Sequence, residues 1–446
     1  MNRLRQGSRL GRIIRSIGGH YSLHRALRIL GFLVLLATTA FAMLTVIGCP
    51  QPINAPPASY AARSSRELIS HFEQVPLVRV LVAGGGSLRV CCSGAYRTLA
   101  DGRIVAEGSQ PMPEVELACT AEGWNLGGNL YPGSTLVIEP QQRALLKLGQ
   151  LWYRGKIAFV RGDDGGILAV NHLDVESYLA GVISKELYPN WNDVTYQAQC
   201  IAARTYALYE KALAGPEHPY DLRSDQGSQV YGGLLSETDK SWRAVQATHG
   251  QVLATGPAGR EVIFKAYFSA CCGGLSNSAY VLNGDPVRSG PLAGGRVCED
   301  CVACPKYRWP AVSIPKSVVY RALVASYPQM RDLGRLSAIE AVEDAQGDRP
   351  VWVDAVGPGG GRLRVRADDL RLALLRDGDA RAKGIYSMNC RIQNVGDNIV
   401  FDQGRGFGHG VGLCQWGAQG KAEAGYSAHQ ILACYYPGAQ IITAYP

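Results

Sequence analysis

Hydrophobic and polar residues follow two different periods along this chain. From Val78 to about Val170, short β-branched runs such as VRVLVAG, STLVIE and GKIAFVRG are broken by Gly, Asp and Pro, which is typical of short antiparallel strands. After residue 170, apolar residues recur at helical spacing in two segments, and strands, Gly-rich loops and short helices then alternate to the C-terminus. The pattern predicts an α+β fold, with an antiparallel, β-rich N-terminal part and helices packed on sheet.

Two helices are expected directly after the strand-rich part. The first begins after Asp174, an N-cap residue, with Glu176 in its first turn, where a negative charge suits the helix dipole. Its apolar residues recur across positions 179–187. The second helix runs from about Asp193 to Ala214, and Gly215-Pro216 stops it.

The N-terminus has the pattern of an export signal. A stretch with arginines but no acid precedes an uncharged apolar run from Ile29 to Ile47, which is just long enough to cross a bilayer. The arginines place the N-terminus in the cytoplasm by the positive-inside rule. The run ends in Val46-Ile47-Gly48-Cys49, which resembles a bacterial lipobox with Cys49 as the lipidated residue; an uncleaved signal anchor is the alternative. Both alternatives predict a location in the cell envelope, outside the inner membrane, as a lipoprotein or a membrane-anchored protein.

Composition then divides the chain into a leader, a tether and an exported domain. Residues 1–49 are a signal peptide or membrane anchor, and residues 50–77, which begin with a Pro-, Ala- and Ser-rich stretch, form a tether. Residues 78–446 form the domain, with a strand-rich part at 78–170 and a catalytic part at 171–446. The net charge is +8, and seven arginines without any acid or lysine lie in residues 1–49, so 8 − 7 leaves +1 for the rest. A nearly neutral body argues against a nucleic-acid partner.

Glu186 is the candidate for acid–base chemistry. It lies nearly two helical turns after Leu179 and therefore shares a face with Leu179, Val182 and Ile183. A carboxylate among apolar residues is either buried with a partner or poised in a cleft, where desolvation raises its pKa toward that of a general acid. The alternative is an ordinary glutamate at a frayed helix end, because Pro189 follows closely.

Arg204 lies on one face of the second helix together with Gln197, Ile201 and Leu208. Its planar guanidinium could orient a carboxylate or a substrate oxygen. An ordinary salt bridge is the alternative, and the arginine alone does not decide between the two.

A Gly-rich loop near the C-terminus is the second candidate for substrate binding. Glycine alternates with other residues over 404–412, so that the backbone can approach a ligand closely. Arg405 and His409 lie within this loop, and Gln415 and Trp416 follow it. Arg and Gln can bond sugar hydroxyls and Trp can stack on a sugar ring, so we expect Gly-rich loops to line a carbohydrate-binding cleft. A tight turn in which His409 makes a local hydrogen bond is the alternative.

Five motifs in a fixed order carry a family resemblance. They are YLAGVISKELYPNW (178–191), QAQCIAARTYAL (197–208), SDQGSQVYGG (224–233), YFSACCGGLSNSAYVLNG (267–284) and GRGFGHGVGLCQWGAQGKAEAGYSAHQILACYYPGA (404–439). Together they resemble the stage II sporulation protein D family (SpoIID), which shares a domain with the amidase enhancer LytB. The resemblance covers about residues 78–446.

The resemblance implies an activity and a set of site residues. Studied members of the family are lytic transglycosylases that cleave peptidoglycan glycan strands stripped of stem peptides, and their catalytic glutamate corresponds to Glu186. This chain has Ser184-Lys185-Glu186 there, with a lysine between the serine and the glutamate of the family's motif. The positions that resemble the family's cleft are Asp225, Gln229, Tyr231, His409 and Gln415.

The mechanism that the resemblance implies needs one carboxyl group. Protonated Glu186 donates to the oxygen between N-acetylmuramic acid and N-acetylglucosamine, and its carboxylate then takes the proton from the muramic 6-hydroxyl, which closes a 1,6-anhydro ring. A second carboxylate to activate water, as in ordinary glycosidases, is not needed. The chief alternative is a non-catalytic peptidoglycan-binding module that activates an amidase. A zinc peptidase is disfavoured because no H-E-x-x-H motif occurs.

The cysteines indicate a structural metal site without a catalytic cofactor. Cys298, Cys301 and Cys304 form a C-x-x-C-x-x-C run, and Cys271-Cys272 precedes it, which is a common zinc pattern. We expect zinc bound by Cys298, Cys301, Cys304 and Cys272, or Cys271 in its place; some relatives are similar in carrying a structural zinc near this loop. Disulfides are the alternative in an oxidising compartment. An iron–sulfur cluster is disfavoured because the leader has no twin arginine. Cys200 and Cys414 are expected to serve packing.

Overall fold

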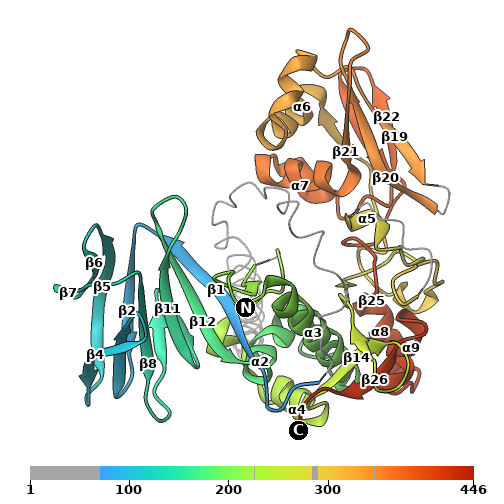
Figure 1. The fold of residues 1–446 in the computed structure, drawn as a ribbon. Helices are drawn as coiled ribbons and strands as arrows, with labels where there is room; N and C mark the ends of the chain where they lie inside the picture. Colours follow the sequence, from blue (N-terminus) through green and yellow to red (C-terminus); the bar gives the residue numbers. More distant parts are fainter. Residues whose placement is uncertain (1–70, 226, 284–289, 345–346) are drawn as a thin grey trace, which may run out of the picture. The chain divides into compact units, whose positions relative to one another are not determined.

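The computed structural model describes residues 71–446 except residues 226, 284–289 and 345–346. The predicted leader (1–49) and most of the predicted tether (50–77) therefore lie outside the described residues. The predicted α+β class is confirmed (Figure 1). Within the described ranges, no helix has the length and apolarity that a bilayer-spanning segment needs.

The N-terminal part contributes twelve strands to two sheets, and the larger sheet also includes β13 (Leu222–Arg223) from later in the chain (Figure 1). The larger sheet has the order β13-β1-β12-β11-β8-β3-β4, and the smaller has the order β10-β9-β2-β5-β6-β7. The strands are β1 (Leu77–Gly85), β2 (Ser87–Cys92), β3 (Tyr96–Ala100), β4 (Arg103–Gly108), β5 (Met112–Thr120), β6 (Gly123–Leu126), β7 (Asn129–Tyr131), β8 (Thr135–Pro140), β9 (Leu146–Leu148), β10 (Leu151–Tyr153), β11 (Lys156–Arg161) and β12 (Ile167–Asp174).

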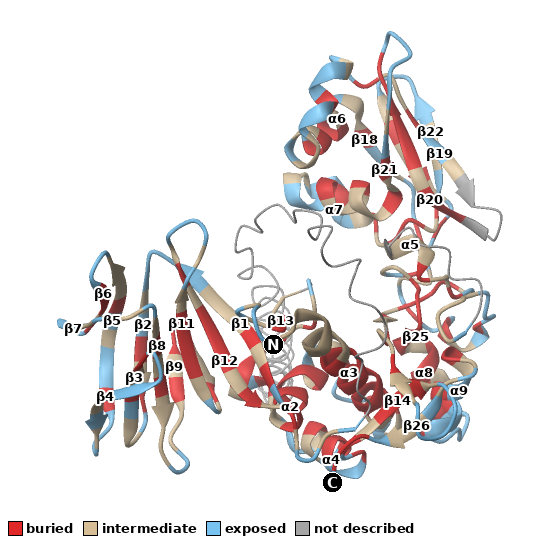
Figure 2. Cartoon of the chain, viewed as in Figure 1, coloured by how far each residue is buried: buried red, intermediate tan, exposed pale blue. Residues whose placement is uncertain are grey.

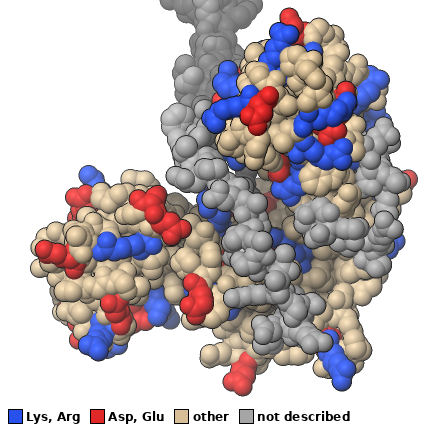
Figure 3. All heavy atoms as spheres, turned by 45° about the horizontal axis from the view of Figure 1, so that its top comes forward, with Lys and Arg blue, Asp and Glu red and all other residues tan. Residues whose placement is uncertain are grey.

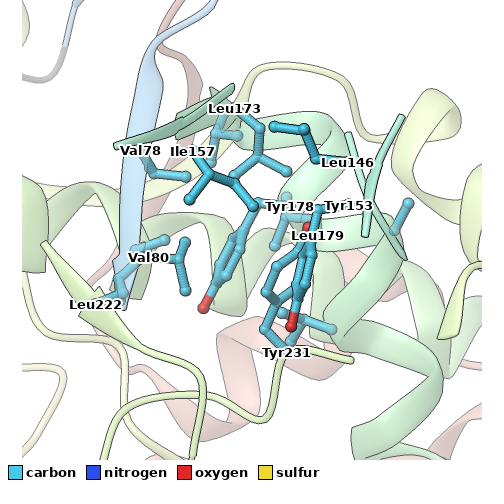
Figure 4. Packing of buried hydrophobic residues seen from close by; sticks show 14 of the residues in the cluster. Val78, Val80, Leu146, Tyr153, Ile157, Leu173, Tyr178, Leu179, Leu222 and Tyr231 are labelled. Atoms are coloured by element: carbon cyan, nitrogen blue, oxygen red, sulfur yellow. The ribbon is translucent and has the colours of Figure 1, made fainter. Parts of the chain in front are cut away.

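Alternation along these strands forms the first core. β1 pairs with β12 in antiparallel register, with Val78 opposite Leu173. Alternate side chains of each strand point into the core, so that Val78 and Val80 of β1 and Ile157 of β11 are fully buried. Figure 4 shows these side chains gathered beside Tyr178, which comes from the first helix. The sheet therefore provides the surface on which the helix that carries Glu186 is packed.

Both predicted helices are present. Helix α2 (Val175–Glu186) begins after Asp174, whose carboxylate accepts a bond from the Ser177 amide at 2.8 Å. Helix α3 spans Asp193–Ala214 and ends at Gly215, where φ is 68°. The local signals in the sequence thus set the start of α2 and the end of α3.

The remaining elements are short. The further helices are α4 (Asp239–Ala247), α5 (Tyr280–Asn283), α6 (Lys316–Ser326), α7 (Ala367–Asp377), α8 (Gln415–Glu423) and α9 (Ala428–Tyr435), and the 3₁₀ helices are η3 (Gly233–Ser236), η4 (Glu299–Cys301), η5 (Pro328–Leu333) and η6 (Ala380–Gly384). The strands are β13 (Leu222–Arg223), β14 (Gln251–Thr255), β15 (Val262–Ile263), β16 (Phe268–Ser269), β17 (Arg308–Trp309), β18 (Val312–Pro315), β19 (Ala338–Asp344), β20 (Gly347–Val356), β21 (Arg362–Arg366), β22 (Arg391–Val395), β23 (Asn398–Asp402), β24 (Gly404–Arg405), β25 (Leu413–Cys414) and β26 (Gln440–Thr443).

Within residues 71–446, apart from the undescribed gaps, buried residues form three hydrophobic cores; Figure 2 shows the buried positions along the chain. The first joins the N-terminal sheets to α2, α3 and α4. The third contains one face of α3, helices α8 and α9 and six cysteines. Helix α3 contributes to both, because Ala203 and Leu208 belong to the first core and Ala198 and Ile201 to the third. This helix therefore links the N-terminal sheets to the C-terminal motifs.

A second core lies within the predicted catalytic part. Residues between Trp309 and Phe401 form it, where α6 and α7 pack on short antiparallel sheets. Its surface carries many ion pairs, including Arg391 with Asp402 at 2.6 Å. Figure 3 shows Lys and Arg lying among Asp and Glu on one face of the molecule. Exposed pairs of this kind add little stability each.

Candidate active site

Glu186 lies at the end of α2, where the helix stops at Leu187. Leu179, Val182 and Ile183, which precede it on the same helix, are fully buried in the first core. Glu186 itself keeps some exposed surface. The helix thus holds the carboxyl at the margin of the core rather than in bulk solvent, as the apolar spacing indicates.

The Glu186 carboxyl has two neutral hydrogen-bond donors. One oxygen accepts from the Val230 amide at 3.3 Å, and the other accepts from the Gln415 side-chain amide at 3.4 Å. Among the described residues, no ion pair involves Glu186. Burial raises the pKa of this carboxyl, and the bonds from Val230 and Gln415 only partly oppose that shift. A carboxyl with a raised pKa and no cation beside it is suited to donate and recover a proton near neutral pH.

Gln415 brings the end of the Gly-rich loop to Glu186, and the family resemblance implies that both residues belong to one cleft. It is the first residue of α8 and follows β25, which pairs in parallel with β16. The Cys414 sulfur caps this helix by accepting a bond from the Gly417 amide at 3.4 Å. Gln415 is 5% exposed, so its amide is held in place by packing.

Gln229 and Tyr231 lie on either side of Val230 and fix its amide. The Gln229 side chain accepts from the Tyr178 hydroxyl at 3.0 Å, and the Tyr231 hydroxyl donates to Asn171 at 3.2 Å. Both residues are almost fully buried, and in Figure 4 Tyr231 lies beside Tyr178. The sequence predicts that Gln229 and Tyr231 bind substrate, but in the structure these buried side chains hold the loop whose Val230 amide bonds Glu186. They are therefore positioning residues.

Tyr231 also explains a glycine in α2. A Cβ atom at Gly181 would come within 2.6 Å of the Tyr231 ring. The Gly232 amide donates to the Gly181 carbonyl at 3.2 Å. The loop therefore packs directly on the helix backbone, one turn before Glu186.

Arg204 does not reach the site. It is fully buried and forms a bidentate ion pair with Glu176, at 3.0 and 2.7 Å, and it also donates to the Gln251 carbonyl at 3.0 Å. This is the salt bridge that the sequence left open as the alternative. A guanidinium without exposed surface cannot contact a substrate, so the substrate-binding role predicted for Arg204 is corrected to a structural one.

Asp225, Arg405 and His409 make local contacts, and none of them bonds Glu186 in the described part of the chain. Asp225 pairs with Arg223 at 3.0 Å, and Arg405 is exposed in β24. The His409 ring accepts a bond from the Val411 amide at 3.0 Å, which is the local turn given as its alternative. Burial lowers the pKa of His409 to about 4, so the ring is neutral near pH 7. Substrate contacts by Asp225, Arg405 and His409 stay predictions.

His409 lines a small cavity of about 10 Å³ together with Arg349 and Asp368. Arg349 is buried and donates to the Gly408 and His409 carbonyls at 3.1 and 2.9 Å. Arg349, which lies on β20, thus holds the Gly-rich loop through its backbone.

Three aromatic residues that follow Glu186 or Gln415 in the sequence form a cluster. Tyr188 lies 5.2 Å from Trp191 and 5.7 Å from Trp416, measured between ring centroids, and Trp191 lies 5.0 Å from Trp416. Tyr188 is 55% exposed. The sequence pattern predicts only Trp416 as a stacking residue; the signal that could have identified Tyr188 is its place two residues after Glu186.

Four cysteines form a compact cluster, and Cys414 is one of them. The sulfur atoms of Cys272, Cys298, Cys301 and Cys414 all lie within 4.8 Å of one another and are buried. The prediction that Cys304 belongs to this set, and that Cys414 only packs, is corrected: Cys414 takes the fourth place. Cys414 was missed because it lies in a different motif, 142 residues after Cys272 along the chain.

The surroundings of the four sulfurs fit a tetrahedral metal. The Cys272 and Cys301 sulfurs are 3.7 Å apart, close to the edge of about 3.8 Å that a tetrahedron with Zn–S bonds of about 2.3 Å requires. The Cys414 sulfur accepts amide bonds from Cys272 and Gly417 at 3.3 and 3.4 Å, and the Tyr435 hydroxyl lies 3.1 Å from the Cys298 sulfur. Such bonds to sulfur are typical of thiolate ligands.

Comparison with known proteins identifies the family to which this chain is similar. Residues 163–254, which include α2, α3 and the Val230 loop, match the family described as stage II sporulation protein. An uncharacterised protein of Brachyspira hyodysenteriae is 30% identical over 302 residues, which cover 66% of this chain and 73% of the relative. The stage II sporulation protein D of Bacillus subtilis is 26% identical over 293 residues, covering 62% of this chain and 76% of the relative. The amidase enhancer of Bacillus subtilis is 24% identical over 297 residues, covering 58% of this chain and 39% of the relative. The chain belongs to the stage II sporulation protein D family.

Proposed function

We propose that this protein acts on the bacterial cell wall as a lytic transglycosylase, cleaving peptidoglycan glycan strands with Glu186 as acid and base. Membership in the family and the likeness to an amidase enhancer support a cell-wall role. The observation that carries the finer proposal is the Glu186 carboxyl, which is desolvated, has no cationic partner among the described residues and is bonded by two neutral amides. Such a group exists as a carboxylic acid at higher pH than an exposed glutamate does.

In the first step, Glu186 gives its proton to the glycosidic oxygen between N-acetylmuramic acid and N-acetylglucosamine. The carboxylate that remains is stabilised by the Val230 and Gln415 amides, which hold it without neutralising it. It then takes the proton of the muramic 6-hydroxyl as that oxygen attacks the anomeric carbon. The bond to the leaving sugar breaks, a 1,6-anhydro ring forms, and Glu186 is protonated again.

In this proposal, the sugar rings of the bound glycan strand contact the aromatic cluster. Tyr188 lies two residues after Glu186, Trp416 follows Gln415 directly, and the exposed ring of Tyr188 offers an apolar face. The apolar face of a sugar ring packs well on such a surface. This arrangement would hold the strand while the proton moves.

The decisive experiment compares the full-length protein with Glu186→Gln on glycan strands prepared with and without stem peptides. Products are identified by mass spectrometry, and anhydro ends are the signature. We expect anhydro products from the wild type on denuded strands and none from the variant. Glu217→Gln, a change in the exposed segment after α3, is the matched control and should keep wild-type activity. Wild-type activity in Glu186→Gln would refute the assignment.

A second candidate function is amidase enhancement without catalysis, which the likeness to the amidase enhancer of Bacillus subtilis favours. The same pair of proteins distinguishes it. If purified wild-type protein and Glu186→Gln stimulate a peptidoglycan amidase equally, and neither releases anhydro products, the chain is an enhancer. Stimulation that disappears with Glu186→Gln points instead to cleavage that prepares the amidase's substrate.

The proposed location is the cell envelope, outside the inner membrane. The basic and apolar leader supports it, with Cys49 as a lipidation site or the apolar run as an anchor. Mass spectrometry of the mature N-terminus separates the two forms: a lipidated N-terminal Cys49 excludes the anchor, and an intact leader excludes the lipoprotein.

We also propose a structural zinc held by Cys272, Cys298, Cys301 and Cys414. Four thiolates would close its coordination, so the metal would stabilise the fold and take no part in proton transfer. Because Cys414 caps α8, the zinc would link this helix, and thereby Gln415, to the segments that carry Cys272, Cys298 and Cys301. Cys414→Ser should reduce the zinc content of the purified protein, whereas Cys390→Ser, a buried cysteine of the second core, should not. Equal metal content in the two variants would exclude this site.

A further inference from the structure

Two arginines lie directly opposite each other at the start of the Gly-rich loop. Strands β17 and β24 pair in antiparallel register, with Arg308 opposite Arg405 and Trp309 opposite Gly404. Side chains of directly opposite residues lie on the same face of such a pair, with Cβ atoms about 4.5–5.5 Å apart. Trp309 and Gly404 are buried and both arginines are exposed. The two arginine side chains therefore extend from the solvent-facing side of this strand pair.

The positive charges of this arginine pair are not compensated within the described part of the chain. There, neither Arg308 nor Arg405 forms an ion pair or a side-chain hydrogen bond. Asp402, three residues before Arg405, is already held by Arg391 at 2.6 Å and by Gln393 at 2.7 Å. Like charges directly opposite each other destabilise a strand pair. An anionic ligand on this face would remove the repulsion.

A third cation and an exposed aromatic ring adjoin the arginine pair. Lys306, two residues before Arg308, has its ammonium 4.2 Å from the centre of the Tyr386 ring. Phe407, two residues after Arg405, lies 5.6 Å from the same ring between centroids and is 42% exposed. We call Lys306, Arg308, Arg405 and Phe407 the basic patch. Its positive charge and its apolar ring together suit an anionic sugar.

We propose that the basic patch binds the free lactyl carboxylates of N-acetylmuramic acid in denuded glycan strands. This inference rests on the proposed glycan cleavage and names the feature by which a denuded strand is selected. Where a stem peptide is attached, the lactyl group is an uncharged amide. Hydrolysis of that amide removes the peptide and leaves a carboxylate, which a guanidinium binds with two parallel hydrogen bonds.

The basic patch belongs to the same loop as the hydrogen-bond partner of Glu186. Arg405 lies ten positions before Gln415, whose side-chain amide bonds the Glu186 carboxyl. Ten residues span at most about 35 Å. A single glycan strand can therefore contact both the patch and Glu186. Binding at the patch would hold the strand that Glu186 cleaves and would take no part in proton transfer.

Binding is measured with the full-length Glu186→Gln protein as the parent, so that the strand stays intact and the result does not depend on cleavage. The ligands are denuded strands and the same strands with their lactyl carboxylates converted to primary amides. We expect the parent to prefer denuded strands. Adding Arg308→Gln/Arg405→Gln should weaken binding to denuded strands about tenfold or more, because charge-assisted bonds are lost, and leave binding to amidated strands unchanged. Arg331→Gln/Arg335→Gln, at exposed positions in and just after η5, changes the charge equally and should bind both ligands like the parent.

Several outcomes of this binding experiment would overturn the proposal. One is equal affinity of the parent for denuded and amidated strands, and another is unchanged affinity in Arg308→Gln/Arg405→Gln. Equal weakening on both ligands would show that the arginines do not recognise the carboxylate. Poly(glycerol phosphate) is the third ligand, and tighter, patch-dependent binding of this polymer would assign the patch to a phosphate polymer instead. Thermal unfolding excludes misfolding: because like charges are removed, the double variant should unfold at the parent's temperature or above it.

Kinetics separate this inference from the proposed cleavage. In the protein that keeps Glu186, Arg308→Gln/Arg405→Gln should raise KM on denuded strands and leave kcat unchanged, since the patch binds the ground state and the transition state alike. A fall in kcat with unchanged KM would place the arginines in the catalytic machinery and overturn the proposal. If the wild type releases no anhydro products, the proposed cleavage fails, and the binding measurements still decide whether the patch recognises the carboxylate.

Discussion

Two glutamates of helix α2 have opposite surroundings. Glu176, in the first turn, receives two bonds from Arg204, one from the Gly250 amide at 3.2 Å and one from the Tyr445 hydroxyl at 2.5 Å. Glu186, in the last turn, receives two longer bonds from neutral amides. The Glu176 carboxylate is neutralised by a buried cation, whereas the Glu186 carboxyl is desolvated and has no cationic partner in the part of the chain that the structure describes.

The difference shows how one helix can carry a structural and a chemical carboxyl. An ion pair in the core fixes its charge state, because removing either partner leaves an uncompensated buried charge. A carboxyl held by neutral amides can gain or lose its proton while its position is kept. The electrostatic partner, rather than burial, separates the two glutamates.

The largest expected effect concerns the second carboxyl. Glu186→Gln keeps the shape and the neutral charge of the acid form but cannot donate or accept the proton. General acid–base catalysis contributes about 10²–10⁴-fold, so the release of anhydro products should fall by at least that factor. Steady-state assays on denuded glycan measure it. Glu176→Gln should instead lower stability, and a variant of Glu186 that unfolds as easily as that of Glu176 would contradict the comparison.

The next largest effect concerns the Glu176 carboxylate and is a change in the free energy of unfolding. Arg204→Ala leaves Glu176 buried and unpaired, and the free energy of unfolding should fall by about 3–5 kcal/mol. Denaturant titration measures it, with Arg243→Ala at an exposed position as a control expected to change by about 0.5 kcal/mol or less. The double variant Arg204→Met/Glu176→Gln removes both charges and should recover part of the loss. If the Arg204→Ala variant folded with normal stability but lost catalytic activity, the structural role of Arg204 would be contradicted and a role in the active site would be supported.

Local signals predicted much of this arrangement. The Asp174 cap, the bounds of α3 and the apolar face of Glu186 each depend on residues within a few turns, and the structure has all three. The meeting of Glu186 with Gln415 came from the resemblance to a family and not from spacing, since the two residues lie 229 positions apart.

What the sequence missed depends on long-range packing. The partner of Arg204 is 28 residues away on another helix, and helical periodicity cannot choose between a salt bridge and a substrate contact. Spacing likewise favoured Cys304, the neighbour of Cys301, whereas the fold brings Cys414 to the other three sulfurs. The composition of the sequence does not change at the borders of the segment from Trp309 to Phe401, so its separate core was not predicted.

A smaller effect is the pH dependence of catalysis. The acid form of Glu186 starts the reaction, so kcat/KM should fall as pH rises through its pKa, which burial raises above the ordinary value. Stability follows the same sign: the folded chain binds this proton more tightly than the unfolded chain, so the ionised form at higher pH destabilises the fold. A profile of kcat/KM against pH measures this decrease at alkaline pH, which is the alkaline limb of the profile. If kcat/KM fell only toward acidic pH, the role of Glu186 as proton donor would be contradicted.

The smallest effect sharpens the role of the amides. Gln415→Leu removes one donor that stabilises the carboxylate of Glu186, so the pKa should rise further and the alkaline limb of kcat/KM should move to higher pH. A hydrogen bond worth about 0.5–1 kcal/mol corresponds to a shift of about half a unit. Gln430→Leu, at the exposed start of α9, is the control and should leave the limb in place. Because Glu176 is bonded by a cation and two further donors, no such adjustment by a single neutral amide is expected there. A limb that moves to lower pH in Gln415→Leu would show that this amide favours the acid form, and the account of a carboxylate held by two neutral donors would fail.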